Sequence, residues 1–152
     1  MIDKIIFSEF FFSKNKSIEI HGFSGHEYSK ENAKPNLFIT PTGSLEKDIV
    51  RTFIQKLKTP DLIYVENYSV DKKIFRRSRR LDFVLIYRNE ISLIDVIDKI
   101  SDKMKVVRKI NDQISEIEEI KSVIILLNKK IDQEKIILNV KKSVIITYEQ
   151  SS

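Results

Sequence analysis

The sequence predicts an α/β domain in which helices flank a mixed central β-sheet. Apolar runs of strand length recur along most of the chain, and two longer segments carry apolar residues at the helical period. These segments follow one another in the order helix, three strands, helix and further strands, which is typical of helices packed on a mixed sheet. The 152 residues, 41% of them hydrophobic and 32% charged, fit one globular domain, 1–152.

Residues 1–42 form an N-terminal extension before the core. Two strands, 4–12 and 17–23, are expected to pair as a β-hairpin around a polar turn. The next residues, 24–36, contain glycine, asparagine and proline and are predicted to be irregular. A short strand is expected at 37–40. The extension is therefore predicted to add a β-hairpin to the core.

The core, residues 43–148, begins with a helix predicted at 45–58. Ser44 is a suitable N-cap residue. Thr59 and Pro60 end the helix, because the residue before a proline avoids the helical conformation. The apolar positions recur with the helical period: Leu45, Ile49, Val50, Phe53, Ile54 and Leu57. One side of this helix is therefore expected to pack on the sheet.

The rest of the core contains strands and one long helix. Ser101 is the expected cap of a helix that continues to about residue 119. Segment 132–140 is predicted as either a short helix or a strand. The strands are predicted at 62–66, 81–87, 91–97, 122–127 and 143–148. The run 122–127 is apolar on both faces, which indicates a central strand.

The composition limits the kinds of site and partner that this protein can have. The chain has no cysteine, which excludes disulfides, thiolate metal sites and cysteine nucleophiles. A net charge of +5 favours a polyanionic partner such as nucleic acid. No apolar run approaches the roughly 18 residues of a membrane span, and the start of the chain lacks a small-residue cleavage site. We therefore expect an intracellular protein with no membrane partner.

Two carboxylates lie inside apolar strands. Asp82 is near the start of 81–87, and Asp95 is inside 91–97. Burying an unpaired carboxylate is costly, whereas two acids on neighbouring strands suit Mg²⁺ or Mn²⁺. The alternative is structural, with the acids paired to Arg79, Arg80 or Lys99.

The element order and the places of these acids resemble the PD-(D/E)XK nuclease superfamily over residues 43–148, in particular archaeal junction resolvases and RecB-like nucleases. The resemblance implies a restriction-endonuclease-like core, with metal ligands at Asp82 and Asp95. It also implies a ligand at Glu46, where the resolvases carry a helix glutamate. Glu46 lies at the start of the apolar stripe that contains Val50 and Phe53. The alternative for Glu46 is a favourable acid near a helix N-terminus.

The superfamily pattern places a lysine two residues after the second strand acid, and Ile97 stands there. The lysine orients the attacking water, so another residue would have to do so. Lys99 has the strand parity of Asp95, and Lys103 lies on the inward side of the long helix. A third possibility is that no lysine serves and the site is inactive.

The long helix carries one further resemblance. RecB-like members have a glutamine in the helix after their lysine, and Gln113, with Lys109 one turn before it, matches that place. The alternative is a polar residue on the helix flank.

A run of basic residues precedes Asp82. It is either a solvated loop or a clamp for nucleic-acid phosphates: Lys72, Lys73, Arg76, Arg77, Arg79 and Arg80. The sequence thus predicts a metal-dependent nuclease that hydrolyses phosphodiester bonds, with DNA as the expected substrate. One alternative is an inactive nucleic-acid-binding module on the same fold. Another is a structural or assembly protein in which the N-terminal strands mediate homodimerisation.

Overall fold

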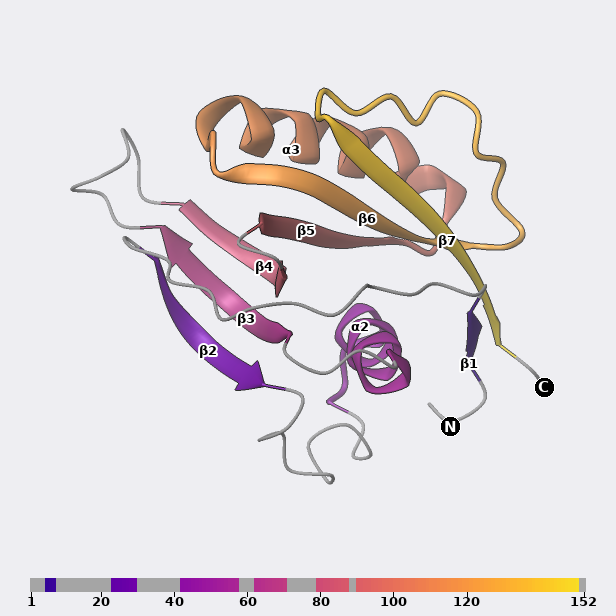
Figure 1. The fold of residues 1–152 in the computed structure, drawn as a ribbon. Helices are drawn as coiled ribbons and strands as arrows, with labels where there is room; N and C mark the ends of the chain where they lie inside the picture. Colours follow the sequence, from indigo (N-terminus) through magenta and orange to yellow (C-terminus); the bar gives the residue numbers. More distant parts are fainter. Residues whose placement is uncertain are drawn as a thin grey trace.

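The computed structural model describes residues 5–7, 23–29, 42–57, 62–70, 79–87 and 90–150. Within these residues, seven strands form one mixed sheet, and two α-helices cover its opposite faces (Figure 1). The strands are β1 Ile5–Phe7, β2 Phe23–Ser29, β3 Ile63–Val70, β4 Arg79–Tyr87, β5 Glu90–Ile97, β6 Ile120–Asn128 and β7 Lys142–Gln150. The helices are α2 Leu45–Lys56 and α3 Lys103–Glu116. The predicted α/β class with a mixed, helix-flanked sheet is confirmed.

The sheet has the order β1-β7-β6-β5-β4-β3-β2. Strands β5, β6 and β7 are parallel neighbours, whereas β2, β3, β4 and β5 pair antiparallel in sequence. The parallel step from β5 to β6 passes through α3, which explains why a helix lies between these two strands in the sequence. The antiparallel strands β4 and β5 need only a short turn.

The N-terminal segment differs from the prediction. Strand β1 pairs antiparallel with β7 and β2 pairs antiparallel with β3, so they extend opposite edges of the sheet. The predicted hairpin between 4–12 and 17–23 is therefore wrong for the residues described. Residues 24–29, predicted to be irregular, belong to β2. Strand β1 pairs with backbone groups that β7 would otherwise expose, and β2 does the same for β3. Local sequence patterns do not reveal which strand edges are free for such pairing. The strand predicted at 37–40 lies outside the described residues.

Helix α2 packs on one face as its pattern predicts. The Ser44 side chain caps it by accepting a hydrogen bond of 3.3 Å from the Lys47 backbone N–H. From Ile49 onward the predicted apolar stripe and the facing strand residues form one hydrophobic cluster, which includes Val50, Phe53 and Leu85, whereas Leu45 at the start of the helix is exposed. This burial holds the helix against the middle of the sheet.

Helix α3 covers the other face, where Val84, Leu93 and Ile110 belong to a second buried cluster. A 3₁₀ helix, Ile100–Asp102, precedes it, and Asp102 rather than Ser101 occupies the N-cap position. The segment 132–140 forms neither the helix nor the strand predicted. It is instead tied to α3 by Asn111, whose side chain donates to the Ile137 carbonyl at 3.0 Å and accepts from the Asn139 N–H at 2.9 Å.

Neither helix among the described residues is both long and apolar enough to cross a membrane.

Candidate active site between β4, β5 and α3

The register of β4 and β5 brings the two predicted acids together. Their ladder extends from the Tyr87–Glu90 pair to the Val84–Leu93 pair. Continued by two residues, the same register sets Asp82 opposite Asp95, just beyond the last paired residues. Because side chains alternate between the faces of a sheet, both carboxylates share the α3 face with Val84 and Leu93. The predicted neighbouring strands are confirmed.

The two carboxylates converge on one ammonium group from α3. Lys109 Nζ lies 3.2 Å from Asp95 Oδ1 and 3.5 Å from Asp82 Oδ2. The three side chains come from three different elements, β4, β5 and α3. The sheet and the helix that packs on it therefore hold two negative charges and one positive charge at a single point.

Burial distinguishes the two acids. The Asp95 side chain is 11% exposed, whereas that of Asp82 is 45% exposed. Burial raises the pKa of Asp95 to about 6, although the ammonium of Lys109 opposes the shift, and the charges of Asp82 and Glu46 add to it. Partial burial alone would lower the pKa of Lys109, but Asp95 and Asp82 outweigh it and raise that pKa. Lys109 therefore stays protonated at neutral pH.

Glu46 lies in the first turn of α2 and is exposed to solvent. It does not continue the buried stripe of Val50 and Phe53 inward. Its charge nevertheless contributes to the raised pKa values of Asp95 and Tyr148, so it is close enough to act on both. No contact of the Glu46 side chain with Asp82 or Asp95 occurs among the described residues, so its role as a third metal ligand stays a prediction.

The two lysines proposed to replace the missing motif lysine lie elsewhere. Ile97 is fully buried. Lys99 is exposed next to the 3₁₀ helix, and no contact of its side chain with Asp82 or Asp95 occurs within the described ranges. Lys103 is 8% exposed, and its Nζ donates a hydrogen bond of 2.6 Å to the Asp132 carbonyl. Its expected swing over the strand ends is therefore wrong, because the ammonium holds the segment after β6.

Lys109 is the residue that sequence reasoning missed, since it drew attention only as the neighbour of Gln113. The sequence signal that could have identified Lys109 was its position around the long helix relative to the apolar residues. Val106 and Ile110 mark the inward side of α3, and Lys109 lies at the border of that side. A long cation at such a border can reach inward to two acids while part of its stem stays hydrated. Gln113 is half-buried one turn later on the same helix.

Only the end of the predicted basic run falls within the described residues. Lys72, Lys73, Arg76 and Arg77 lie outside them, and Arg79 is described as backbone within β4. Arg80 is exposed, and one of its guanidinium nitrogens lies 3.8 Å from Asp82 Oδ1. This contact is the pairing that the structural alternative expected for Asp82. Its exposure makes it a weak interaction that a phosphate could replace.

A second polar cluster fixes the strand ends beside the site. The Tyr148 hydroxyl donates to Asp98 Oδ1, and the Asn128 side-chain amide lies 3.3 Å from the same oxygen. Burial and the adjacent Asp98 carboxylate raise the pKa of Tyr148. These contacts join the ends of β5, β6 and β7. Asp98 lies on the opposite face from Asp95, as strand parity predicts.

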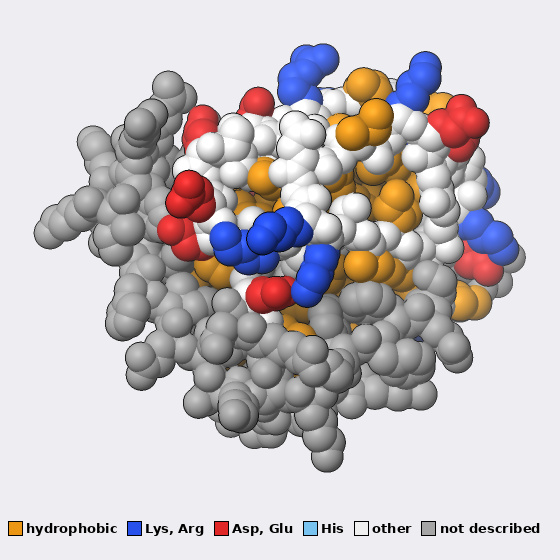
Figure 2. Space-filling view, turned by 45° about the horizontal axis from the view of Figure 1, so that its top comes forward, with side chains coloured by type: hydrophobic (Ala, Val, Ile, Leu, Met, Phe, Trp, Pro, Cys, Tyr) orange, Lys and Arg blue, Asp and Glu red, His pale blue; other side chains and the backbone are white. Residues whose placement is uncertain are grey.

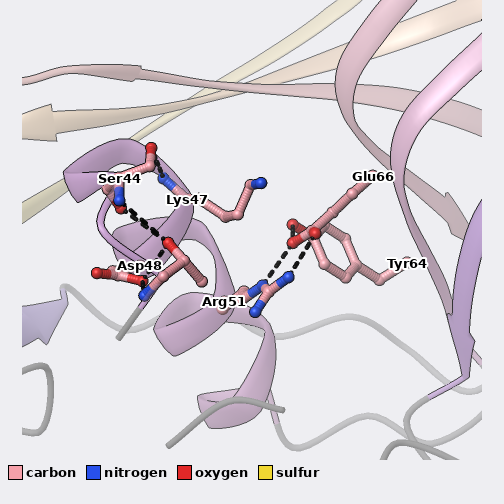
Figure 3. A network of polar contacts seen from close by, with 7 residues as sticks. Ser44, Lys47, Asp48, Arg51, Tyr64 and Glu66 are labelled. Atoms are coloured by element: carbon pink, nitrogen blue, oxygen red, sulfur yellow. Dashed lines mark hydrogen bonds and ion pairs between the residues drawn. The ribbon is translucent and has the colours of Figure 1, made fainter. Parts of the chain in front are cut away.

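A buried ion pair anchors α2, the helix that carries Glu46 (Figure 3). Arg51 binds the Glu66 carboxylate through Nε and one terminal nitrogen, each at 2.7 Å, and the Tyr64 hydroxyl donates to it at 2.6 Å. Burial opposes the charge of Glu66, but hydrogen bonds from Arg51 and Tyr64 lower its pKa. The bidentate contact fixes the position of α2 over β3.

The donor set is compatible with a hard divalent cation. In the parts of the chain that the structure describes, no group of three or more His, Cys, Asp or Glu side chains could hold a metal ion. Mg²⁺, however, commonly binds through one or two carboxylates and keeps water or substrate phosphates as its other ligands. Asp82 and Asp95 already direct one oxygen each toward a common positive charge. The pair therefore fits Mg²⁺ or Mn²⁺ as two carboxylate ligands.

Comparisons with models of known protein families, with curated proteins and with solved structures found no match.

Proposed function

We propose that this protein is a metal-dependent nuclease that hydrolyses phosphodiester bonds, with DNA as the expected substrate. The observation that carries the proposal is the convergence of Asp82, Asp95 and Lys109 on one point. Two acids and a lysine are the groups that PD-(D/E)XK nucleases use, and the element order resembles theirs. Here the lysine comes from α3, while Ile97 fills the usual lysine position.

The acid pair would hold the cation, with Glu46 as a further ligand directly or through water. A bound Mg²⁺ or Mn²⁺ would stabilise the charge that develops on the phosphate and make the attacking water more acidic. Asp95 has to be ionised to act as a ligand, and its pKa of about 6 allows this at neutral pH. Asp82 is more exposed and lies toward the solvent side, where a substrate would approach.

Lys109 has two roles in this proposal. Without a cation, its ammonium neutralises the acid pair. With the acids engaged by a cation, the same ammonium can move a short distance to donate a hydrogen bond to the attacking water or to a phosphate oxygen. Its position in the middle of α3, which packs on the sheet, limits that movement. Arg80, beside Asp82, would contact the substrate backbone.

Cleavage assays with single substitutions test the proposal. The parent should cut DNA with Mg²⁺ or Mn²⁺ and stop when EDTA is added. Asp82→Asn and Asp95→Asn should each lose activity by about 10²-fold or more. Asp112→Asn is the matched control, because Asp112 is an exposed acid of α3. No cutting of duplex, single-stranded or branched DNA, or of RNA, would refute the nuclease proposal.

The second candidate is a nucleic-acid-binding module without catalysis. It is favoured by one observation, the fully buried Ile97 at the position of the superfamily's lysine. In that case Lys109 would serve only as a counter-ion for the two acids. Metal-independent DNA binding by the parent, together with no cleavage under any of the conditions above, would select this candidate.

A further inference from the structure

The outer edge of α3 next to Lys109 carries unpaired positive charge. Lys105 and Arg108 are exposed, and their side chains make no hydrogen bond or ion pair with any other described residue. From Lys103 to Asn111 the helix contains four basic residues and no acid. Acids return only at its two ends, with Asp102 before and Asp112 after this stretch. The positive charge is thus confined to about two turns of helix.

The phase of α3 connects this charge with the candidate site. Lys105 precedes Lys109 by four residues, and residues at this spacing lie on the same side of a helix with Cβ atoms about 5–6 Å apart. Arg108 is three residues after Lys105 and lies farther round the helix, away from the sheet. The face on the α3 side, brought forward in Figure 2, shows basic side chains gathered near its middle with acidic ones beside them. The cationic edge therefore leads from the acid pair outward along the helix.

We propose that Lys105 and Arg108 bind backbone phosphates of a nucleic-acid strand, one or two nucleotides away from the phosphate at the acid pair. This inference rests on the proposed function, and it defines the path of the substrate. The spacing supports it, because each nucleotide of a strand rises by about 3.4 Å along the duplex axis, so the helical turn of about 5.4 Å between Lys105 and Lys109 spans one or two nucleotides measured along that axis. A planar guanidinium at Arg108 suits a phosphate group.

The predicted contacts are to phosphates and carry little sequence information. They require a strand that continues beyond the reacting phosphate along α3. The substrate class is therefore an oligonucleotide or longer nucleic acid, and a mononucleotide ester would leave both cations without a ligand.

Binding in EDTA tests this surface without cleavage. Fluorescence anisotropy would follow a labelled DNA duplex and its single strand at several salt concentrations. The variant Lys105→Ala/Arg108→Ala should bind both on the order of tenfold more weakly. The slope of log affinity against log salt should flatten by about 1.4–1.8, because two fewer phosphates are neutralised.

The matched control removes two charges from the opposite end of the sheet. Lys121 and Lys141 are exposed there, beside Ser122 and Lys142, which pair at the start of β6 and β7. Lys121→Ala/Lys141→Ala should keep the affinity and salt slope of the parent. Equal weakening by both double variants would mean that only net charge matters and would overturn the proposal. A polyglutamate competitor as effective as DNA would also overturn it.

A second variant and a cleavage assay separate a loss of DNA binding from a loss of folding or of catalysis. Lys105→Gln/Arg108→Gln, in which both replacements are good helix formers, should reproduce the alanine result with an unchanged circular dichroism spectrum. One outcome is that the parent cuts DNA while the alanine and glutamine variants of Lys105 and Arg108 bind and cut DNA as the parent does. In that case the proposed binding surface is refuted and the nuclease proposal stands. If nothing cuts but binding depends on Lys105 and Arg108, the nuclease proposal fails and the surface stands.

Discussion

Replacing Asp95 by asparagine should make the protein more stable at neutral pH. Burial raises the pKa of this carboxyl from its ordinary value of 3.8 to about 6 in the folded protein. At about 1.36 kcal/mol per pH unit, the ionised form therefore costs the folded state about 3 kcal/mol. Asparagine has a similar shape and carries no charge, so it removes this cost.

The effect has a defined pH dependence. Below pH 3.8 the carboxyl is protonated in both the folded and the unfolded chain, so its ionisation contributes nothing. Between pH 3.8 and about 6 the folded chain still holds a proton that the unfolded chain has lost, so stability falls as the pH rises. Above about pH 6 the full cost is present. Asp95→Asn should show no such fall.

Urea unfolding of the parent and of Asp95→Asn, measured in metal-free buffer from pH 3.5 to 7.5, checks this. The difference in unfolding free energy between the two proteins should change by about 3 kcal/mol in favour of Asp95→Asn across that range. Asp112→Asn, at an exposed position of the same domain, should give a curve parallel to that of the parent. Parallel curves for Asp95→Asn and the parent would refute the idea that a buried, destabilising carboxylate is kept for function.

Three further substitutions test the contacts around the site. Lys109→Met should bind Mn²⁺ several-fold more tightly in a calorimetric titration, because its ammonium no longer competes for Asp82 and Asp95; weaker binding would contradict the overlap of the two cations. Arg51→Met should lower the free energy of unfolding by about 3–5 kcal/mol, because it leaves Glu66 charged and buried. A loss below about 1 kcal/mol would show that Glu66 is not dependent on its partner. Tyr148→Phe should lower the free energy of unfolding by about 1.5–3 kcal/mol, the value of one hydrogen bond to a carboxylate such as Asp98, and equal stability of the two proteins would argue against that bond.

Most of the core could be predicted because its signals are local. The N-cap and apolar stripe of α2 predicted a helix at 45–58, and the helix observed is Leu45–Lys56. Strand-length apolar runs predicted β4 and β5 as neighbouring strands that each carry one acid, whereas the shared face of the two acids follows from the observed register. The edge pairing of β1 and β2 was missed because it depends on which strand edge is free in three dimensions.

The site could be predicted in part for the same reason. Asp82 and Asp95 were found because a charge inside an apolar strand is unusual. Lys109 was missed because strand parity and sequence proximity directed attention to Lys99 and Lys103. Its proximity to the acids follows from the packing of α3 across β5, which brings residues 14 positions apart within 3.2 Å. No local pattern encodes that distance.

Single-turnover DNA cleavage by Lys109→Met, compared with Lys99→Met, tests most directly whether these three residues form a catalytic centre. Both substitutions remove one lysine, but only Lys109 contacts the acid pair. With saturating protein and Mn²⁺, Lys109→Met should cut about 10²-fold more slowly than the parent, the scale of general acid–base and electrostatic contributions. Lys99→Met should cut at the parent rate. A parent-like rate for Lys109→Met, or a comparable loss for Lys99→Met, would contradict the assignment of Lys109 as the catalytic lysine.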